Sequence, residues 1–137
     1  MENSKLKITT FLMFQNDNAE EAMNFYISLF DNSKILNITH YGANEGGKEG
    51  TVMHAVFQLN GQEYMCIDSP IKHDFTFTPS TSLYVTCDSI EKVDNLFAKL
   101  SEGGTTLMPL GAYPFSERFG WVNDKYGVSW QLTFEKK

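Results

Sequence analysis

The sequence predicts an α+β protein made of two similar modules, each with the element order β-α-β-β-β, whose sheets curve to form a mixed β-sheet cleft. The first observation is an internal repeat. Segments 11–29 and 82–100 each contain a short alternating strand, an Asp, a Glu three residues later and then a helical pattern. A constant offset of 71 residues relates the copies, so that Asp17 corresponds to Asp88. The second observation is that each half contains one helical pattern, and one helix can cover only one face of a small sheet. The other face of each sheet is therefore expected to line the cleft.

The first module is expected at residues 1–69. Asp17 and Glu20 have the spacing of a capping box, in which side chains bond the free N–H groups of the first helical turn. Asn60-Gly61 between two alternating segments is the strongest short-range signal for a β-hairpin. In order, the expected elements are a strand within 5–15, a helix over about 19–30, a strand over 34–41, a polar loop over 42–50, and a hairpin of strands 51–59 and 62–68.

A linker is expected at residues 70–80, which contain Pro70 and Pro79, and the second module at 81–137, the whole forming one compact domain. Asp88 and Glu91 repeat the capping-box spacing, and Gly103-Gly104 is typical of a helix end. In order, the expected elements are a strand over 81–87, a helix over about 89–100, a strand over 105–110, an aromatic loop over 111–117, and a hairpin of strands 118–123 and 128–134.

The bulk composition excludes several classes of partner. The chain has 137 residues, 42% of them hydrophobic, and a formal net charge of −6. An acidic surface repels nucleic acid and anionic lipid, so neither nucleic acid nor a membrane is an expected partner. The first residues contain no export signal and no apolar run long enough to span a bilayer, which makes the cytoplasm the expected compartment. Cys66 and Cys87 form no Cys-x-x-Cys pair and are expected to be buried thiols.

Side-chain alternation along the strands predicts which residues line the cleft. Nine positions are expected to face it, none of them charged: Phe11, Met13, Gln15, Ser82, Tyr84, Thr86, Ser129, Gln131 and Thr133. This wall of rings, thioether and hydroxyl groups suits a small, mostly apolar molecule with a few hydrogen-bonding groups. Aromatic residues gather near the last hairpin, and most are expected in the core. Trp121 is the one expected to contact a ligand.

Three features together resemble one protein family: Met53-His54-Ala55 on the third strand, Asp68 at the end of the fourth, and the run FGWVNDKYGVSWQL over 119–132. They are similar to the PhnB-like group of the vicinal oxygen chelate superfamily, which includes glyoxalases, bleomycin-resistance proteins and ring-cleaving dioxygenases. Many members of the group carry the label 3-demethylubiquinone-9 3-methyltransferase domain. The resemblance covers nearly the whole chain and implies the glyoxalase-like fold of paired βαβββ modules. It also implies a homodimer.

The resemblance places the superfamily's metal ligands on Phe11, Ser82 and Gln131, with the fourth-strand ligand on Cys66, or on Met65 if the register differs by one. Phe11 has no lone pair to donate, and neutral Ser82 and Gln131 are poor ligands for Zn²⁺, Ni²⁺ or Fe²⁺. We therefore expect no metal and no other cofactor. Phe11, Cys66, Ser82 and Gln131 are instead expected to contact a small-molecule ligand directly.

Three polar residues are candidates for catalysis. His54 could act as a general base, the alternative being a hydrogen-bonded strand histidine or one at a subunit contact. Asp68 could reach the cleft beside Cys66. Arg118 could hold a ligand carboxylate or enolate, the alternative being a surface ion pair.

Three classes of function remain after these exclusions. The first is a small-molecule binding protein with a metal-free cleft, which the missing metal ligands favour. The second is an enzyme of the same superfamily, either a metal-assisted isomerase, lyase or dioxygenase or the methyltransferase of the family label. No glycine-rich strand–turn–helix suited to a nucleotide-like cofactor is present in the sequence. The third is a non-catalytic interaction or structural subunit.

Overall fold

The computed structural model describes residues 6–135, which fall into two compact units with the boundary between Thr76 and Phe77. The boundary lies within the segment 70–80 that the sequence marks as a linker. Each unit contains one helix and one four-stranded mixed sheet, so the predicted α+β class and the β-α-β-β-β order are confirmed. Within residues 6–135, neither helix has the length and apolarity needed to span a lipid bilayer.

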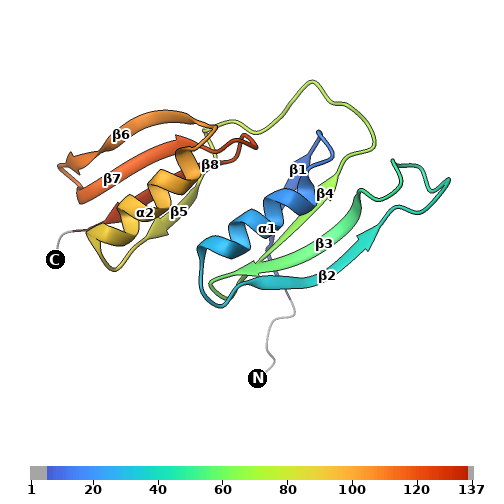
Figure 1. Cartoon of the computed structure of the whole chain (residues 1–137), viewed down its shortest axis with the longest axis horizontal. Coiled ribbons are helices and arrows are strands. Elements are labelled where there is room, and N and C mark those ends of the chain that lie inside the picture. The colour runs from blue at the N-terminus through green and yellow to red at the C-terminus, as the bar shows by residue number, and fades with distance from the viewer. Residues whose placement is uncertain (1–5, 136–137) are drawn as a thin grey trace. The chain divides into compact units, whose positions relative to one another are not determined.

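Unit 1 consists of β1 (Thr10–Phe14), α1 (Ala19–Leu29), β2 (Lys34–His40), β3 (Val52–Leu59) and β4 (Gln62–Asp68). Its sheet has the order β1-β4-β3-β2, in which β1 and β4 are parallel and the other neighbours antiparallel. Figure 1 shows α1 lying across one face of this sheet. The face beneath the helix is apolar and buried, and its members include Leu12, Phe14, Ala55, Phe57, Leu59 and Cys66.

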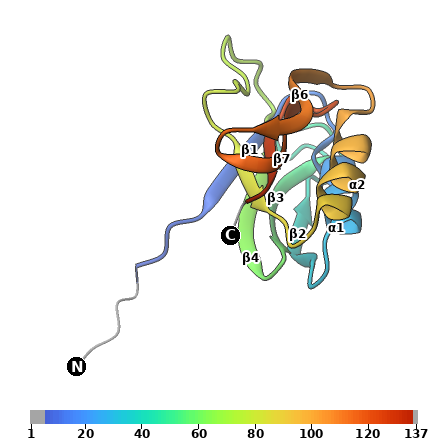
Figure 2. The same ribbon diagram turned by 90° about the vertical axis from the view of Figure 1, so that its left-hand side faces the viewer.

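Unit 2 consists of β5 (Leu83–Thr86), α2 (Ile90–Ser101), β6 (Thr105–Tyr113), β7 (Ser116–Asn123) and β8 (Ser129–Phe134). The order β5-β8-β7-β6 repeats that of unit 1, again with one parallel pair. Figure 2 shows each helix on one side of its own sheet. Buried side chains between α2 and its sheet include Val93, Leu96, Leu100, Val122, Trp130 and Leu132.

Gly120 sets how closely α2 packs on β7. A Cβ atom at this position would lie 2.5 Å from Cδ1 of Phe97 on the helix and 3.3 Å from Cδ1 of Leu110 on β6. No real Cβ atom makes a contact of 2.5 Å, so the phenyl ring occupies the space that any other residue would fill. The absence of a side chain at Gly120 therefore allows an aromatic ring to rest directly on the strand.

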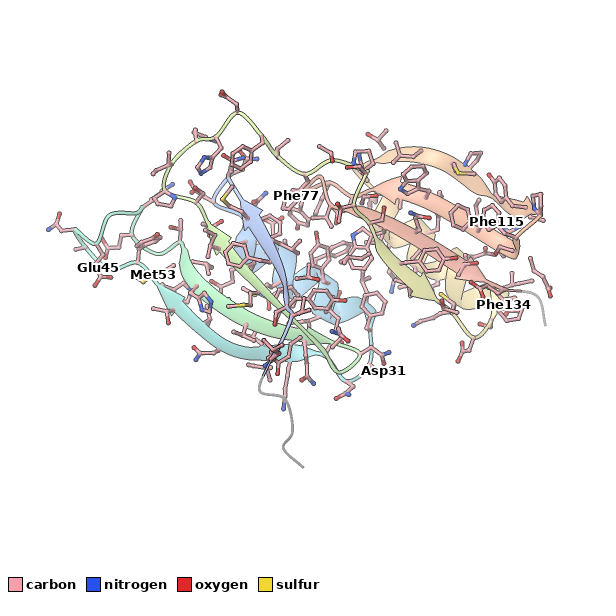
Figure 3. All side chains as sticks on the ribbon, turned by 180° about the vertical axis from the view of Figure 1, so that it is seen from behind. Asp31, Glu45, Met53, Phe77, Phe115 and Phe134 are labelled. Atoms are coloured by element: carbon pink, nitrogen blue, oxygen red, sulfur yellow. The ribbon has the colours of Figure 1, made fainter. Side chains whose placement is uncertain are left out.

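The expected aromatic loop over 111–117 is wrong. β6 continues to Tyr113 and β7 begins at Ser116, so only Pro114 and Phe115 form the turn. The rings of Tyr113, Phe115 and Phe119 pack together with centroid distances of 5.7, 5.6 and 4.9 Å, and this packing stabilises the paired strands. Figure 3 shows Phe115 at the outer end of this hairpin.

The predicted capping boxes are wrong in both units. α1 has Asn18 at its N-cap, with no side-chain cap bond, and Asp17 has a left-handed backbone conformation with φ of 58°. A carboxylate oxygen of Asp68 instead accepts from the amide of Ala19 at 2.9 Å. In α2 the N-cap is Ser89, whose hydroxyl accepts from the Lys92 amide at 3.1 Å. The cap therefore lies one residue later than expected, and it satisfies the amide of Lys92 instead of that of Glu91.

Candidate functional site

Each sheet has one face that its helix does not cover, and we call these the open faces of units 1 and 2. Residues paired directly across neighbouring strands share a face, so the strand register identifies the members. The open face of unit 1 carries Phe11, Met13, His54, Val56, Met65 and Ile67. The open face of unit 2 carries Ser82, Tyr84, Trp121, Ser129 and Gln131. Strand alternation in the sequence predicted this placement for Phe11, Met13, Ser82, Tyr84, Ser129 and Gln131.

The open face of unit 1 is apolar. Phe11 pairs with Met65, and Met65 pairs with Val56, so a ring, a thioether and a branched side chain form one row across three strands. Met13 lies beside Ile67 in the neighbouring row. Half of the Phe11 surface is exposed (50%). This face therefore offers contact surface without directional bonds.

Cys66 lies on the opposite, helix-covered face. Its neighbours across the sheet are Leu12 and Ala55, both buried, and Cys66 itself is fully buried. Burial, with a smaller effect from the Asp68 charge, raises the pKa of the Cys66 thiol to about 12. Met65 is therefore the fourth-strand residue that shares the open face with Phe11. Neighbouring residues of a strand face opposite sides of the sheet, so an error of one residue in the predicted register exchanges the faces of Cys66 and Met65. The sequence alone did not decide between these two residues.

His54 lies on β3 opposite Thr39 of β2, on the open face of unit 1. The side chain is partly exposed, and no side-chain hydrogen bond is recorded between it and another residue of the described chain. An imidazole in this setting can form hydrogen bonds with solvent or with a bound molecule. His54 is therefore accessible in a way that a core histidine is not.

The open face of unit 2 brings together four residues that the sequence predicted as ligand contacts. Tyr84 pairs with Gln131, and Gln131 pairs with Trp121, so a phenol, an amide and an indole form a row across β5, β8 and β7. Tyr84 is 51% exposed. Ser82 lies one step along, where its hydroxyl oxygen is 2.7 Å from that of Ser129. The row thus combines flat apolar surface with hydrogen-bonding groups.

A chain of hydrogen bonds determines that the hydroxyl of Ser129 donates to that of Ser82. The indole N–H of Trp121 can only donate, and it donates to Oγ of Ser129 at 2.8 Å. Ser129 is only 2% exposed, and the acceptor within reach of its own O–H in the described chain is Oγ of Ser82. A buried hydroxyl proton without an acceptor is costly, so Ser129 donates to Ser82. The proton of the partly exposed Ser82 hydroxyl then remains available to a bound molecule.

Asp68 has a well-defined structural role. It is buried at 2% exposure, and its two carboxylate oxygens accept from the amides of Ala19 and Val52, each at 2.9 Å. The carboxylate joins the start of α1, the start of β3 and the end of β4. Because both oxygens already serve backbone donors and the side chain is covered, this geometry favours a structural over a catalytic role.

Arg118 is also engaged by the protein itself. Its Nε donates to Oδ1 of Asp94 at 2.7 Å, and its Nη2 donates to Oδ2 at 3.3 Å. Asp94 belongs to α2, so Arg118 reaches toward the helix-covered face of the sheet. A two-point bond of this kind fixes the guanidinium group. The geometry favours the ion-pair interpretation of Arg118 over ligand binding.

The donor groups do not fit a metal centre at the positions that the resemblance implies. Phe11 and Met65 supply a hydrocarbon ring and a thioether, and Ser82 and Gln131 supply neutral oxygens. Residues 6–135 contain no group of three or more His, Cys, Asp or Glu side chains arranged to hold an ion. Hard and borderline cations prefer imidazole, thiolate and carboxylate ligands. No reaction step is therefore assigned to a metal.

The turns that open the two helices do not fit a nucleotide-like cofactor. Residues 15–18, between β1 and α1, and residues 87–89, between β5 and α2, contain no glycine. Cofactor diphosphates are held where glycines let the backbone approach closely at a helix start. Neither turn has that property.

Comparison with known proteins agrees with the fold. The sequence pattern of the family 3-demethylubiquinone-9 3-methyltransferase matches residues 6–133. The chain is 66% identical to a structure described as a putative 3-demethylubiquinone-9 3-methyltransferase, PhnB protein, from Bacillus cereus, over 94% of this chain and 99% of that one, with a TM-score of 0.91. It is 25% identical to protein PA1353 from Pseudomonas aeruginosa, over 97% and 100% of the two chains, with a TM-score of 0.82.

A more distant likeness shows the fold alone. A glyoxylase/bleomycin resistance protein/dioxygenase domain from Frankia sp. EAN1pec is 15% identical over 98% of this chain and all of that one, with a TM-score of 0.65. No match was found among curated proteins. The chain therefore belongs to the 3-demethylubiquinone-9 3-methyltransferase (PhnB) family, with the fold of the glyoxalase/bleomycin resistance/dioxygenase superfamily.

Proposed function

We propose that the chain binds a small, largely apolar or aromatic molecule on the open face of unit 2, with an oxygen of that molecule accepting a hydrogen bond from Ser82. The observation that carries the proposal is the chain of bonds from Trp121 through Ser129 to Ser82, which leaves the proton of the partly exposed Ser82 hydroxyl available to a ligand. Tyr84 and Gln131 lie beside it and offer a ring face and an amide.

For unit 1, taken by itself, we propose an apolar contact surface on its own open face, made of Phe11, Met13 and Met65, with Met65 in place of Cys66. Met65 is the neighbour of Phe11 on that face. Thioether groups adapt to flat rings, which suits an aromatic ligand. Cys66 is left out because it is buried beneath α1.

The test is a thermal-shift screen of small aromatic compounds with and without carbonyl or quinone oxygens, followed by titration of a stabilising compound. Substituting Ser82→Ala should weaken binding of an oxygen-bearing compound about tenfold, the loss expected for one hydrogen bond. The matched control is Thr81→Ala, which removes the neighbouring, exposed hydroxyl and should leave affinity unchanged. A panel without any stabilising compound, or equal binding by Ser82→Ala, would contradict the proposal.

A second candidate function, catalysis, is supported by one observation: His54 is partly exposed on an open face and has no recorded side-chain bond within the described chain. The family description names a methyl transfer, for which S-adenosylmethionine is the usual donor. Titration calorimetry with S-adenosylmethionine tests this version directly. Saturable binding would support methyl transfer by this chain, and the absence of heat would oppose it.

A further inference from the structure

A polar cavity of about 360 Å³ lies within unit 1. It forms where β1 and β4, which run in the same direction, both end (Figure 1). Its walls come from the residues after β1, from the loop before β3, and from the segment after β4. The volume falls within the range of small-molecule sites, at the lower end.

Most hydrogen-bond donors of the cavity are already in use. The Thr51 hydroxyl donates to the carbonyl of Lys48 at 2.7 Å, and the Ser69 hydroxyl donates to that of Ile71 at 2.7 Å. The side-chain amide of Gln15 donates to the carbonyl of Phe75 at 2.8 Å. These neutral groups stabilise the walls and have little donor capacity left for a bound molecule.

The charged donors of the cavity are two ammonium groups. Lys72 donates to the carbonyl of Gln15 at 2.7 Å and lies 3.3 Å from Oδ1 of Asn16, both of which are neutral acceptors. No carboxylate of the described chain lies within ion-pair distance of Lys72. Lys48 lies 3.5 Å from the Asp17 carboxylate, which is long for such a pair. An ammonium group has three donors, so both lysines keep hydrogens for a further acceptor.

The charges around the cavity therefore sum to a positive value in a protein whose formal net charge is −6. Lys48 and Lys72 carry two positive charges against the single negative charge of Asp17. A molecule with several acceptor oxygens and a negative charge matches this arrangement, whereas a cation or a donor-rich molecule does not.

We propose that this cavity is a binding site for a small oxyanion, phosphate or a phosphate monoester, held between Lys48 and Lys72. None of the residues that line the site belongs to the open face of unit 2. The space beyond one phosphate group accommodates the organic part of an ester.

The experiment is an NMR titration of the ¹⁵N-labelled chain with inorganic phosphate and, separately, with glycerol phosphate, against sodium chloride of equal ionic strength. Saturable shifts of amides within 15–17, 48–51 and 69–72 are expected with phosphate or its ester and not with chloride. Tighter binding of the ester would identify an ester site, and equal binding a free-phosphate site. Linear shifts, or shifts spread over the chain, would overturn the proposal, because they would indicate an adventitious ion effect only.

Four substitutions, one of them a control, distinguish binding at this site from a general effect of charge. Lys72→Met and Lys48→Met should each weaken binding about tenfold, as expected for loss of a charge-assisted bond. The matched control is Lys34→Met, which removes the same charge elsewhere in unit 1. Asp17→Asn should strengthen binding about threefold because it removes the opposing charge. Asn adopts the left-handed conformation of residue 17 readily, so the fold is retained. An equal effect of Lys34→Met, or weaker binding by Asp17→Asn, would overturn the proposal.

Discussion

The two units share one backbone plan and yet stabilise the start of their helices by different means. In unit 1 the buried carboxylate of Asp68, distant in sequence, bonds the first amide of α1 and also the amide of Val52. In unit 2 the exposed start of α2 is capped by the hydroxyl of Ser89, its own neighbouring residue. The repeat thus preserves the position of each helix, whereas the groups that hold the helix have diverged.

The open faces differ in the same manner. The open face of unit 1 presents a ring and thioethers, whereas that of unit 2 presents hydrogen-bonded side chains, which run from Trp121 through Ser129 to Ser82. Strand alternation keeps these positions equivalent, because it depends only on which face is buried. The chemistry at equivalent positions is free to change, and we expect the specificity of the molecule to lie in those differences.

The largest difference between the two units is expected in the reactivity of their cysteine thiols. Cys66 in unit 1 has a pKa raised to about 12 by burial and by Asp68. Its alkylation by iodoacetamide at pH 8 should be roughly a thousandfold slower than that of an unfolded thiol, since three pKa units reduce the thiolate by that factor. Burial also raises the pKa of Cys87, against a lowering effect of Lys92. Mass spectrometry of labelled peptides should show Cys87 modified first, and similar labelling of both sites would remove the contrast.

The same thiol predicts a loss of stability in alkali. The Cys66 pKa is higher in the folded chain than its ordinary value of 9.0, so the folded state binds the proton more tightly. Its contribution to the free energy of unfolding is complete below about pH 9 and decreases as pH rises toward 12. Urea unfolding of Cys66→Ala, compared with the unchanged chain over this range, should show a flatter dependence on pH.

The next largest effect is the loss of stability expected for Asp68→Asn. The amide side chain has one acceptor oxygen, so one of the two backbone N–H groups, of Ala19 or Val52, loses its partner in a buried place. The free energy of unfolding should fall by about 3 kcal/mol, measured by urea denaturation. Asp88→Asn, an exposed carboxylate at the corresponding end of β5, serves as the control and should change stability by less than about 0.5 kcal/mol. Equal losses of stability in the two variants would mean that the two bonds of Asp68 contribute no more to folding than an exposed carboxylate does.

Ser89→Ala should reduce the stability of the protein less than Asp68→Asn does. It removes the hydroxyl that accepts from the Lys92 amide, and water can replace this bond at a partly exposed helix end. We expect a loss of about 1 kcal/mol in the free energy of unfolding. Hydrogen exchange should quicken in the first turn of α2 and stay unchanged in α1. A loss as large as that of Asp68→Asn would show that both units depend on their caps equally.

The smallest change in stability is expected for a substitution on the open face of unit 1. Phe11→Ser should change the free energy of unfolding by less than about 0.5 kcal/mol, because the ring is half exposed. Leu12→Ala, one residue along and facing α1, should cost about 3 kcal/mol by leaving a cavity. Thermal and urea unfolding of the two variants measure this difference. A large loss for Phe11→Ser would show that this face is part of a packed core.

Alternation and turn chemistry explain why the sequence predicted the order of the strands and helices and the faces of residues such as Phe11, Tyr84 and Gln131. The turn at Asn60-Gly61 has positive φ at both residues, as its sequence indicates. The roles of Asp68 and Arg118 could not be predicted, because each depends on partners far along the chain, Ala19 and Asp94. The same holds for the face of Cys66, which a one-residue difference in register decides.

The packing at Gly120 has a consequence for the family at large. Because Phe97 occupies the volume where a side chain at residue 120 would lie, the two positions cannot be chosen independently. In homologous sequences they should covary, with a bulky aromatic at 97 accompanying glycine at 120 and a smaller residue accompanying alanine. Such paired replacements would trace the helix–strand spacing of unit 2 through evolution without another structure.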